Sequence, residues 1–199
     1  MKGCEVRSLI IKGNSKMGTQ VAVFNLPPKD TCTPTKWCMQ GRGGKPACYA
    51  LRNNCILPSV VASTKTRLAE SRRPDFVDRV IAELDGRFVF ARIHSTGDFY
   101  STEYVRKWET IARALPKIRF RTTTRRRDLV TAITRLAALR NVVIRESLDP
   151  FRSEPKMGLP FAALSGMSVA KGSFKCPNAC DTCGYFCWMS RKSMCFDEH

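Results

Sequence analysis

Apolar residues in the middle of the chain repeat at intervals that predict a helix followed by a strand. The helix begins near Pro74, and its inward positions have the spacing of one helical face: Phe76, Val77, Val80, Ile81 and Leu84. The Asp85-Gly86 step ends this helix, because glycine just after the last apolar turn is a typical stop signal. Residues 87–93 are then mostly apolar and are predicted to form a strand.

Two more helix–strand pairs follow with the same spacing. A helix starting near Ser101 keeps an apolar face until Pro116, and residues 117–122 form the next strand. Asp128 can cap a third helix, which leads into a strand over 141–146. Strands joined by single helices pair in parallel, and right-handed crossovers continued in this way curve toward a barrel. We therefore expect an α/β fold, either a parallel-stranded (β/α) barrel or a partial TIM-like barrel.

The two ends of the chain lack this regular alternation. Each end contains short apolar runs that are candidate strands, at 6–11, 21–24, 161–164 and 167–170. Each end also contains a cysteine-rich segment, over 31–55 and 171–199. A length of 199 residues without repeats or a long linker predicts one domain, 1–199.

Polar side chains gather at the predicted carboxyl ends of the central strands, where parallel α/β folds place their working residues. The candidate catalytic pocket consists of the residues at these ends: Arg92, His94, Asp98, Arg125 and Asp149. Two of them have plain structural alternatives, because Asp98 can cap a helix and His94 can be a packed side chain. We expect the pocket to share one rim with the first cysteine-rich loop.

Ten cysteines exceed what a chain with 43% hydrophobic residues needs for a stable core. The N-terminal residues do not have the pattern of a secretion signal, and no apolar stretch approaches the roughly 18 residues of a membrane span. We therefore expect a cytoplasmic protein that makes no membrane contact. In a reducing compartment, clustered thiols indicate metal or redox chemistry more often than disulfides.

Seven thiols form two groups, and they are the candidate metal and cofactor ligands. Three lie on the N-terminal loop and four near the C-terminal end: Cys32, Cys38 and Cys48, then Cys176, Cys180, Cys183 and Cys187. The spacing of the second group, C-x3-C-x2-C-x3-C, is similar to the ferredoxin pattern but differs from it. This group lacks the paired C-x2-C knuckles of most structural zinc sites, so the spacing favours an iron–sulfur cluster, while a Cys4 zinc site stays open. The other thiols are expected to be buried small hydrophobes or spare thiols: Cys4, Cys55 and Cys195.

The formal net charge of +17 favours a polyanionic partner. Nucleic acid is the default partner for such a chain, and general solubility is the plain alternative. The densest basic stretch is 117–127, which contains six Lys and Arg residues and no acidic residue. The oligomeric state is left open by the sequence.

Several motifs together resemble the gene-product-88 family of phage proteins. They run along most of the chain: Asn14-Ser15-Lys16-x-Gly18, Val23-Phe24-Asn25-Leu26-Pro27-Pro28, Arg92-Ile93-His94-Ser95-x-Gly97-Asp98-Phe99-Tyr100-Ser101, Cys176-Pro177 and Cys180-x2-Cys183-Gly184. Two spacings are longer than the family's pattern, from Cys38 to Cys48 and from Cys183 to Cys187. The resemblance implies a viral iron–sulfur protein that holds a 4Fe-4S cluster and acts in the host cytosol. It implies no particular reaction.

A looser similarity connects the predicted fold to radical S-adenosylmethionine enzymes. Those enzymes also carry three cysteines on a loop after the first strand of a partial barrel. The spacing here is not their C-x3-C-x2-C, and no clear glycine-rich segment for binding S-adenosylmethionine is present. The similarity is one of fold, which does not determine function.

Two functional hypotheses follow, and whether the chain is an enzyme is left open. In the first, the chain binds one or two iron–sulfur clusters and carries out redox or radical chemistry on an anionic substrate at the carboxyl ends of the strands. In the second, the chain is a nucleic-acid-binding protein without catalytic activity, and a Cys4 zinc or iron–sulfur site stabilises its fold. The charge supports the second hypothesis and the thiol spacing supports the first.

Overall fold

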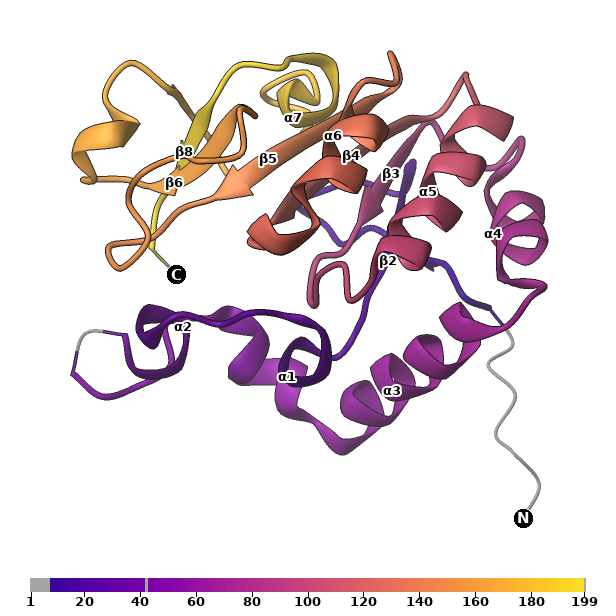
Figure 1. The fold of residues 1–199 in the computed structure, drawn as a ribbon, viewed down its shortest axis with the longest axis horizontal. Coiled ribbons are helices and arrows are strands. Elements are labelled where there is room, and N and C mark those ends of the chain that lie inside the picture. The colour runs from indigo at the N-terminus through magenta and orange to yellow at the C-terminus, as the bar shows by residue number, and fades with distance from the viewer. Residues whose placement is uncertain (1–7, 42, 199) are drawn as a thin grey trace.

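A computed structural model describes residues 8–41 and 43–198 of the chain, so the prediction for Cys4 lies outside the described residues. Its centre is one eight-stranded sheet in the order β1-β2-β3-β4-β5-β6-β8-β7 (Figure 1). The strands are β1 (Ile11–Lys12), β2 (Val21–Phe24), β3 (Phe90–Ile93), β4 (Arg119–Thr124), β5 (Val142–Ser147), β6 (Phe161–Leu164), β7 (Phe174–Lys175) and β8 (Met194–Phe196).

The prediction of a mostly parallel α/β sheet is confirmed. Strands β2 to β6, β8 and β7 pair in parallel, and only β1 pairs antiparallel, with β2. Among the described residues the sheet is open, with β1 and β7 at its two edges. The predicted run at 167–170 is not a strand, because backbone hydrogen bonds from Ala170 to Met167 and from Lys171 to Ser168 close it into a turn.

Of the four longer helices, the first lies below the strands in Figure 1, and the other three form a layer along one side of the sheet. The four are α3 (Pro58–Arg72), α4 (Phe76–Leu84), α5 (Thr102–Ala114) and α6 (Val130–Ala137). The last three confirm the predicted helices, and Ser101 caps α5 by accepting a hydrogen bond from the Tyr104 amide. The structure also contains three short helices and four short 3-10 turns: α1 (Pro28–Thr31), α2 (Lys36–Gln40), α7 (Phe186–Met189), η1 (Tyr49–Leu51), η2 (Asn53–Ile56), η3 (Arg127–Leu129) and η4 (Ser168–Ala170). No helix in the described ranges is both long and apolar enough to cross a membrane.

The main hydrophobic core lies between these helices and the sheet. Its centre is aromatic, with Phe24 of β2 meeting Phe76 of α4 and Trp108 of α5 edge to face, at ring-centroid distances of 5.4 and 5.6 Å. All three side chains are almost completely buried. Edge-to-face packing of this kind stabilises a core by more than the apolar area it buries, so these rings fix α4 and α5 against β2.

The C-terminal segment covers the opposite side of the sheet, called the inner face below. Residues 174–196 contain β7, α7 and β8, and α7 contacts β4 and β5. Trp188 of α7 donates a hydrogen bond from Nε1 to the carbonyl of Ala91 in β3, at 3.1 Å. Arg191 donates to the carbonyls of Ala137 and Leu139, which end α6, and a cation at a helix C-terminus is favourable. The segment is therefore anchored to both the sheet and the helical layer.

A tight loop after β3 holds the chain against the segment that leaves β2. The Leu26 amide donates to the Thr96 carbonyl and the Thr96 hydroxyl donates to the Leu26 carbonyl, both at 3.0 Å. Next to this contact, Gly97 has a φ of +85°. A Cβ atom at Gly97 would lie 2.6 Å from the Leu26 Cβ and 2.8 Å from its carbonyl oxygen. The loop therefore requires glycine at this position.

We expect Gly97→Ala to lower the free energy of unfolding by about 3–5 kcal/mol, because left-handed strain and overpacking add. Gly86→Ala is the matched control, since Gly86 also has a positive φ of +64° but its Cβ would meet nothing within 4 Å. That control should cost only about 1–2 kcal/mol. Urea unfolding of both variants measures the difference, and equal losses would contradict the close approach described here.

Candidate functional site

The first group of thiols lies on the loop that follows β2, at the carboxyl ends of the strands. Cys32 comes directly after α1 and Cys38 lies in α2, where the Thr35 side chain accepts a hydrogen bond from the Cys38 amide. The Cys48 amide donates to the Cys38 carbonyl at 3.3 Å, which brings the two ends of the Gly-rich loop together. Burial raises the pKa of Cys32 to about 12, with further upward contributions from Asp98, Cys48 and Cys38. The fold thus gathers these three thiols at one place.

A buried ion pair borders this first group. Arg125, which follows β4, pairs with Asp149, which follows β5 and is completely buried. The Thr35 hydroxyl donates to an Asp149 oxygen at 2.7 Å and lies 3.5 Å from the Cys38 sulfur. Burial alone would lower the pKa of Arg125, but Cys38 and Asp149 raise it overall. The predicted convergence of Arg125 and Asp149 with the first cysteine loop therefore appears in the structure.

Asp98 lies beside the same thiols, and its carboxylate holds two backbone segments together. Its carboxylate accepts hydrogen bonds from the Thr124 hydroxyl at 2.7 Å and from the amides of Phe99 at 2.7 Å and Arg125 at 2.8 Å. Burial raises the pKa of Asp98 to about 6, although these hydrogen bonds oppose the shift. Because Ser101 is the residue that caps α5, Asp98 is not a simple helix cap.

His94 faces the helical layer and lies apart from the thiols. Its backbone has a φ of 74°, its Nε2 is 2.9 Å from the Tyr104 hydroxyl, and its ring packs edge to face on Phe99. Burial, followed by the charge of Arg92, lowers its pKa to about 3, so the ring is neutral at physiological pH. The packed alternative for His94 therefore describes its place in the structure, while its role in a catalytic pocket stays a prediction.

The second group of thiols lies in the C-terminal segment. Cys176 follows β7, Cys180 and Cys183 lie on the connecting turn, and Cys187 lies in α7. Burial raises the pKa of Cys180 to about 11, and Cys187, Cys183 and Cys176 each raise it further, whereas Arg121 lowers it. The pKa of Cys176 is raised by burial and also by Cys187 and Cys183. All four thiols are therefore close enough to influence one another electrostatically.

This second group packs against the inner face, away from the carboxyl ends of the strands. Cys176, Cys180 and Cys187 belong to a buried apolar cluster with Val21 and Phe90, the first residues of β2 and β3. Figure 1 shows the same separation, with α1 and α2 at one end of the strands and α7 toward the other. The two groups of thiols therefore do not share one rim of the sheet, because the second group packs on apolar residues at the beginnings of the strands.

Three arginines lie on the inner face beside the second group, and two of them, Arg121 and Arg145, are buried. Arg92 in β3 is directly paired in register with Arg121 in β4, and Arg145 in β5 is opposite Thr123. Alternate residues of a strand point to opposite faces, so all three point away from the helical layer. Arg121 and Arg145 are only 6% and 1% exposed. Sequence reasoning selected Arg92 as part of a pocket at the rim and missed the other two.

The partners of these arginines are neutral groups. Arg145 donates to the carbonyls of Cys187, Ser190 and Lys192 at 2.5 to 3.0 Å. Arg121 lies over the Trp188 ring at 4.8 Å from its centroid, and its Nε has no hydrogen-bond partner. Within residues 8–41 and 43–198, none of the three arginines forms a salt bridge with a carboxylate.

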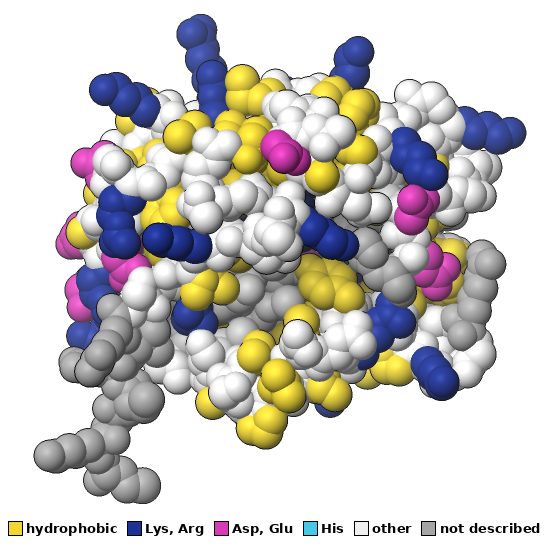
Figure 2. Space-filling model, turned by 180° about the vertical axis from the view of Figure 1, so that it is seen from behind, with side chains coloured by type: hydrophobic (Ala, Val, Ile, Leu, Met, Phe, Trp, Pro, Cys, Tyr) yellow, Lys and Arg dark blue, Asp and Glu magenta, His cyan; other side chains and the backbone are white. Residues whose placement is uncertain are grey.

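The basic stretch at 117–127 is mostly engaged inside the protein. Arg121 is buried, and each of the three consecutive arginines after β4 has a carboxylate partner: Arg125 with Asp149, Arg126 with Asp128, and Arg127 with Glu146. On the side of the molecule opposite to the view of Figure 1, Lys and Arg side chains are scattered among hydrophobic and acidic ones (Figure 2). This stretch therefore does not form an exposed basic surface.

The state and the spacing of the cysteine thiols decide which metal groups they could hold. All the cysteines in the described ranges are free thiols, so no disulfide joins either group. In the same ranges, no three His, Cys, Asp or Glu side chains are grouped so that they could hold one metal ion. Four thiolates around one zinc ion, each at about 2.3 Å from it, lie about 4 Å from one another. An iron–sulfur cluster accepts wider spacing, because each thiolate binds a different iron atom.

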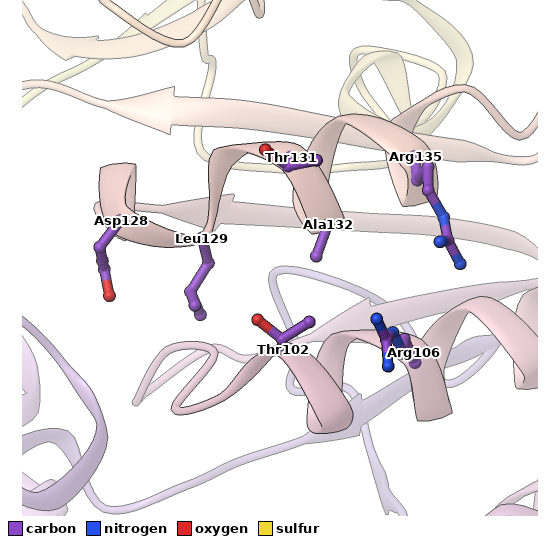
Figure 3. A pocket seen from close by; sticks show the side chains of 7 residues that line it. All are labelled: Thr102, Arg106, Asp128, Leu129, Thr131, Ala132 and Arg135. Atoms are coloured by element: carbon purple, nitrogen blue, oxygen red, sulfur yellow. The ribbon is translucent and has the colours of Figure 1, made fainter.

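Two surface cavities lie away from both thiol groups. One, of about 250 Å³, lies between α5 and α6, with Arg106 and Arg135 facing each other at one end and Thr102 and Leu129 toward the other (Figure 3). The other, of about 370 Å³, lies beside β7 and is lined in part by Lys171 and Lys192. Neither cavity is lined by a cysteine, so the thiol chemistry is not assigned to them.

The two buried titratable groups should give opposite pH dependences. The pKa of His94 is lowered from 6.5 to about 3, so its contribution to stability is complete above pH 6.5 and is lost as the pH falls toward 3. The pKa of Asp98 is raised from 3.8 to about 6, so the folded state gains stability as the pH falls from 6 to 3.8. As the pH falls from 6 to 4, the stability of His94→Asn relative to the wild type should therefore rise by about 1.4 kcal/mol per pH unit. The stability of Asp98→Asn relative to the wild type should fall by about the same amount.

Chemical denaturation at several pH values measures this difference. Asparagine suits position 94 because it tolerates a positive φ, and the other histidine of the chain, His199, is unchanged in both proteins. A stability difference that does not vary with pH for either variant would contradict these pKa shifts.

Comparison with known proteins gives one match. No curated protein and no solved structure matches the chain significantly. The model of the family described as Gene product 88 matches residues 8–156, which covers the sheet from β1 to β5, the first thiol group and the ion pair beside it. This match extends over more than half of the chain and includes the N-terminal and central motifs that carry the resemblance, whereas the C-terminal cysteine motifs lie outside it. The chain therefore belongs to the Gene product 88 family.

Proposed function

We propose that this chain is a phage-encoded redox protein that binds two iron–sulfur clusters, one at each end of an open, barrel-like sheet. The observation that carries the proposal is that the four thiols of the C-terminal segment are free and that three of them, Cys176, Cys180 and Cys187, pack in or against one apolar cluster. Cys176, Cys180, Cys183 and Cys187 would hold one cluster, and Cys32, Cys38 and Cys48 the other. Bound clusters of this kind supply one-electron redox chemistry.

The two groups differ in the roles that their surroundings support. The C-terminal group has four thiols, which is the usual complete ligand set of a cluster. The N-terminal group has three thiols, so one iron atom would be left for a further ligand. This group also lies at the carboxyl ends of the strands, where parallel α/β proteins place their chemistry. We therefore assign an electron-transfer role to the C-terminal group and the reactive role to the N-terminal group.

The residues around the N-terminal group would position its ligands. The Thr35 side chain accepts from the Cys38 amide and donates to Asp149, and Asp149 is fixed by its pair with Arg125. Groups that orient a metal ligand in this way commonly influence affinity for the metal. Because Arg125 is already paired, these contacts support a positioning role for it more than a direct role in binding an anionic substrate.

Nucleic-acid binding is the second candidate function, and the net charge of +17 is the observation in its favour. It predicts affinity for DNA or RNA that falls steeply as the salt concentration rises. It also predicts that Asp98→Asn leaves this affinity unchanged. The engagement of the arginines in 117–127 makes this function the weaker of the two.

Iron and sulfide analysis of the anaerobically purified protein tests the two-cluster proposal. Cys180→Ala should lose roughly half of the iron, and Cys32→Ala should lose the other half, because each variant removes a ligand of one cluster only. Cys55→Ala is the matched control, since Cys55 lies in η2 outside both groups and should retain all the iron.

Two outcomes of that experiment, together with a second measurement, separate the alternatives. Loss of all the iron in both variants would show one cluster that draws ligands from both groups. A colourless protein with stoichiometric zinc would contradict the proposal. Electron paramagnetic resonance spectra recorded with and without S-adenosylmethionine show whether that molecule binds to the iron left open in the N-terminal group.

A further inference from the structure

The inner face concentrates positive charge in an unusual way. Arg92, Arg121 and Arg145 come from three adjacent strands, and the first two are direct neighbours across the β3–β4 pairing. Arg145 is a diagonal neighbour of Arg121, because it lies opposite Thr123, which is two residues along β4 from Arg121. The three guanidinium groups therefore repel one another in a part of the protein that largely excludes water.

Such an arrangement is costly unless something negative compensates it. A buried cation that lacks a counterion costs several kcal/mol even after the surrounding groups relax. Carbonyl groups and the Trp188 ring satisfy part of the hydrogen-bonding and cation–π capacity, but they carry no net charge. The Nε of Arg121 has no partner at all among the protein atoms. The inner face is therefore built to receive an anion.

The four C-terminal thiols are the groups placed to supply that anion. Cys187 and Cys180 are close enough to Arg92 to interact with its charge, and Cys187 is close enough to Arg145 to do the same. Arg121 in turn acts on Cys176 and Cys180. Each arginine is thus within electrostatic range of at least one thiol of this group. Metal ligation requires thiolates, and the charge of four thiolates outweighs that of an iron–sulfide core.

We propose that Arg92, Arg121 and Arg145 form a cationic site that binds the negatively charged cluster held by the C-terminal thiols and raises its reduction potential. This inference rests on the proposed function and assigns a role to residues outside the ligand set. The potential of an iron–sulfur cluster depends on the charge around it. When a one-electron donor adds an electron, the negative charge of the group increases by one, and nearby cations favour that state.

Arg121→Met tests the proposal, because methionine keeps much of the side-chain length but removes the charge and the unpaired Nε. An anaerobic titration with dithionite as the electron donor, followed by optical and electron paramagnetic resonance spectra, gives the reduction potential. We expect a more negative potential in Arg121→Met at unchanged iron content, and a potential near that of the wild type in Arg121→Lys. Arg92→Met should shift in the same direction and serves if Arg121→Met does not fold.

The control is Arg106→Met, whose side chain lies in the surface cavity between α5 and α6 (Figure 3). Its potential should equal that of the wild type. If Arg121→Met and Arg92→Met also keep the wild-type potential, the cationic site is refuted even though the clusters are present.

A second measurement does not require a loaded protein. After removal of iron with a chelator under anaerobic conditions, the three charges have no compensation, so Arg121→Met should be more stable to urea than the wild type, while Arg106→Met should not be. A less stable Arg121→Met apoprotein would overturn the proposal. If the wild type contains no iron, the two-cluster function fails, and the apoprotein comparison still decides whether the inner face carries uncompensated charge.

Discussion

The fold depends on the alternation of side chains along β3, β4 and β5. On each strand, alternate residues face the helices, and those that join the hydrophobic core include Ala91, Phe120 and Ile144. The residues between them face the C-terminal segment and include the three arginines. A sheet with one apolar and one cationic face cannot be covered by the same kind of element on both sides. Amphipathic helices cover the first face, and a short segment rich in thiols and carbonyl acceptors covers the second.

This division separates the two groups of thiols. The N-terminal loop leaves β2 at its carboxyl end and stays there, held by the ion pair of Arg125 with Asp149 and by the hydrogen bonds of Asp98. The C-terminal segment reaches the beginnings of the strands, where Tyr185 stacks on Phe90 at a centroid distance of 4.3 Å. Two groups that look equivalent in the sequence therefore occupy different environments, one among carboxylates and hydroxyls, the other among guanidinium groups and aromatic rings.

The central helices and strands were predictable because their apolar spacing reflects burial against one sheet. The place of Asp98 and Arg125 followed from the rule that strands of a parallel sheet end together. The packing of His94 against Tyr104 could not be predicted, because the positive φ that turns its ring leaves no sign in hydrophobic spacing. The direction of Arg121 and Arg145 could have been predicted, since each alternates along its strand with residues that face the helices. Their significance required the position of α7, a four-residue helix that no periodicity can reveal.

The coverage of the inner face by residues 174–196 also has a consequence for the order of assembly during translation. The part of the sheet from β1 to β5 is complete once residue 147 has been made, and its helical face can then be covered by α4, α5 and α6. The guanidinium groups of the inner face stay in water until α7 has been synthesised and has docked. Electrostatic repulsion among them is weak while they are hydrated. Burial of the arginines is thereby coupled to completion of the sheet, because the segment that covers them also brings the carbonyl groups to which Arg145 donates.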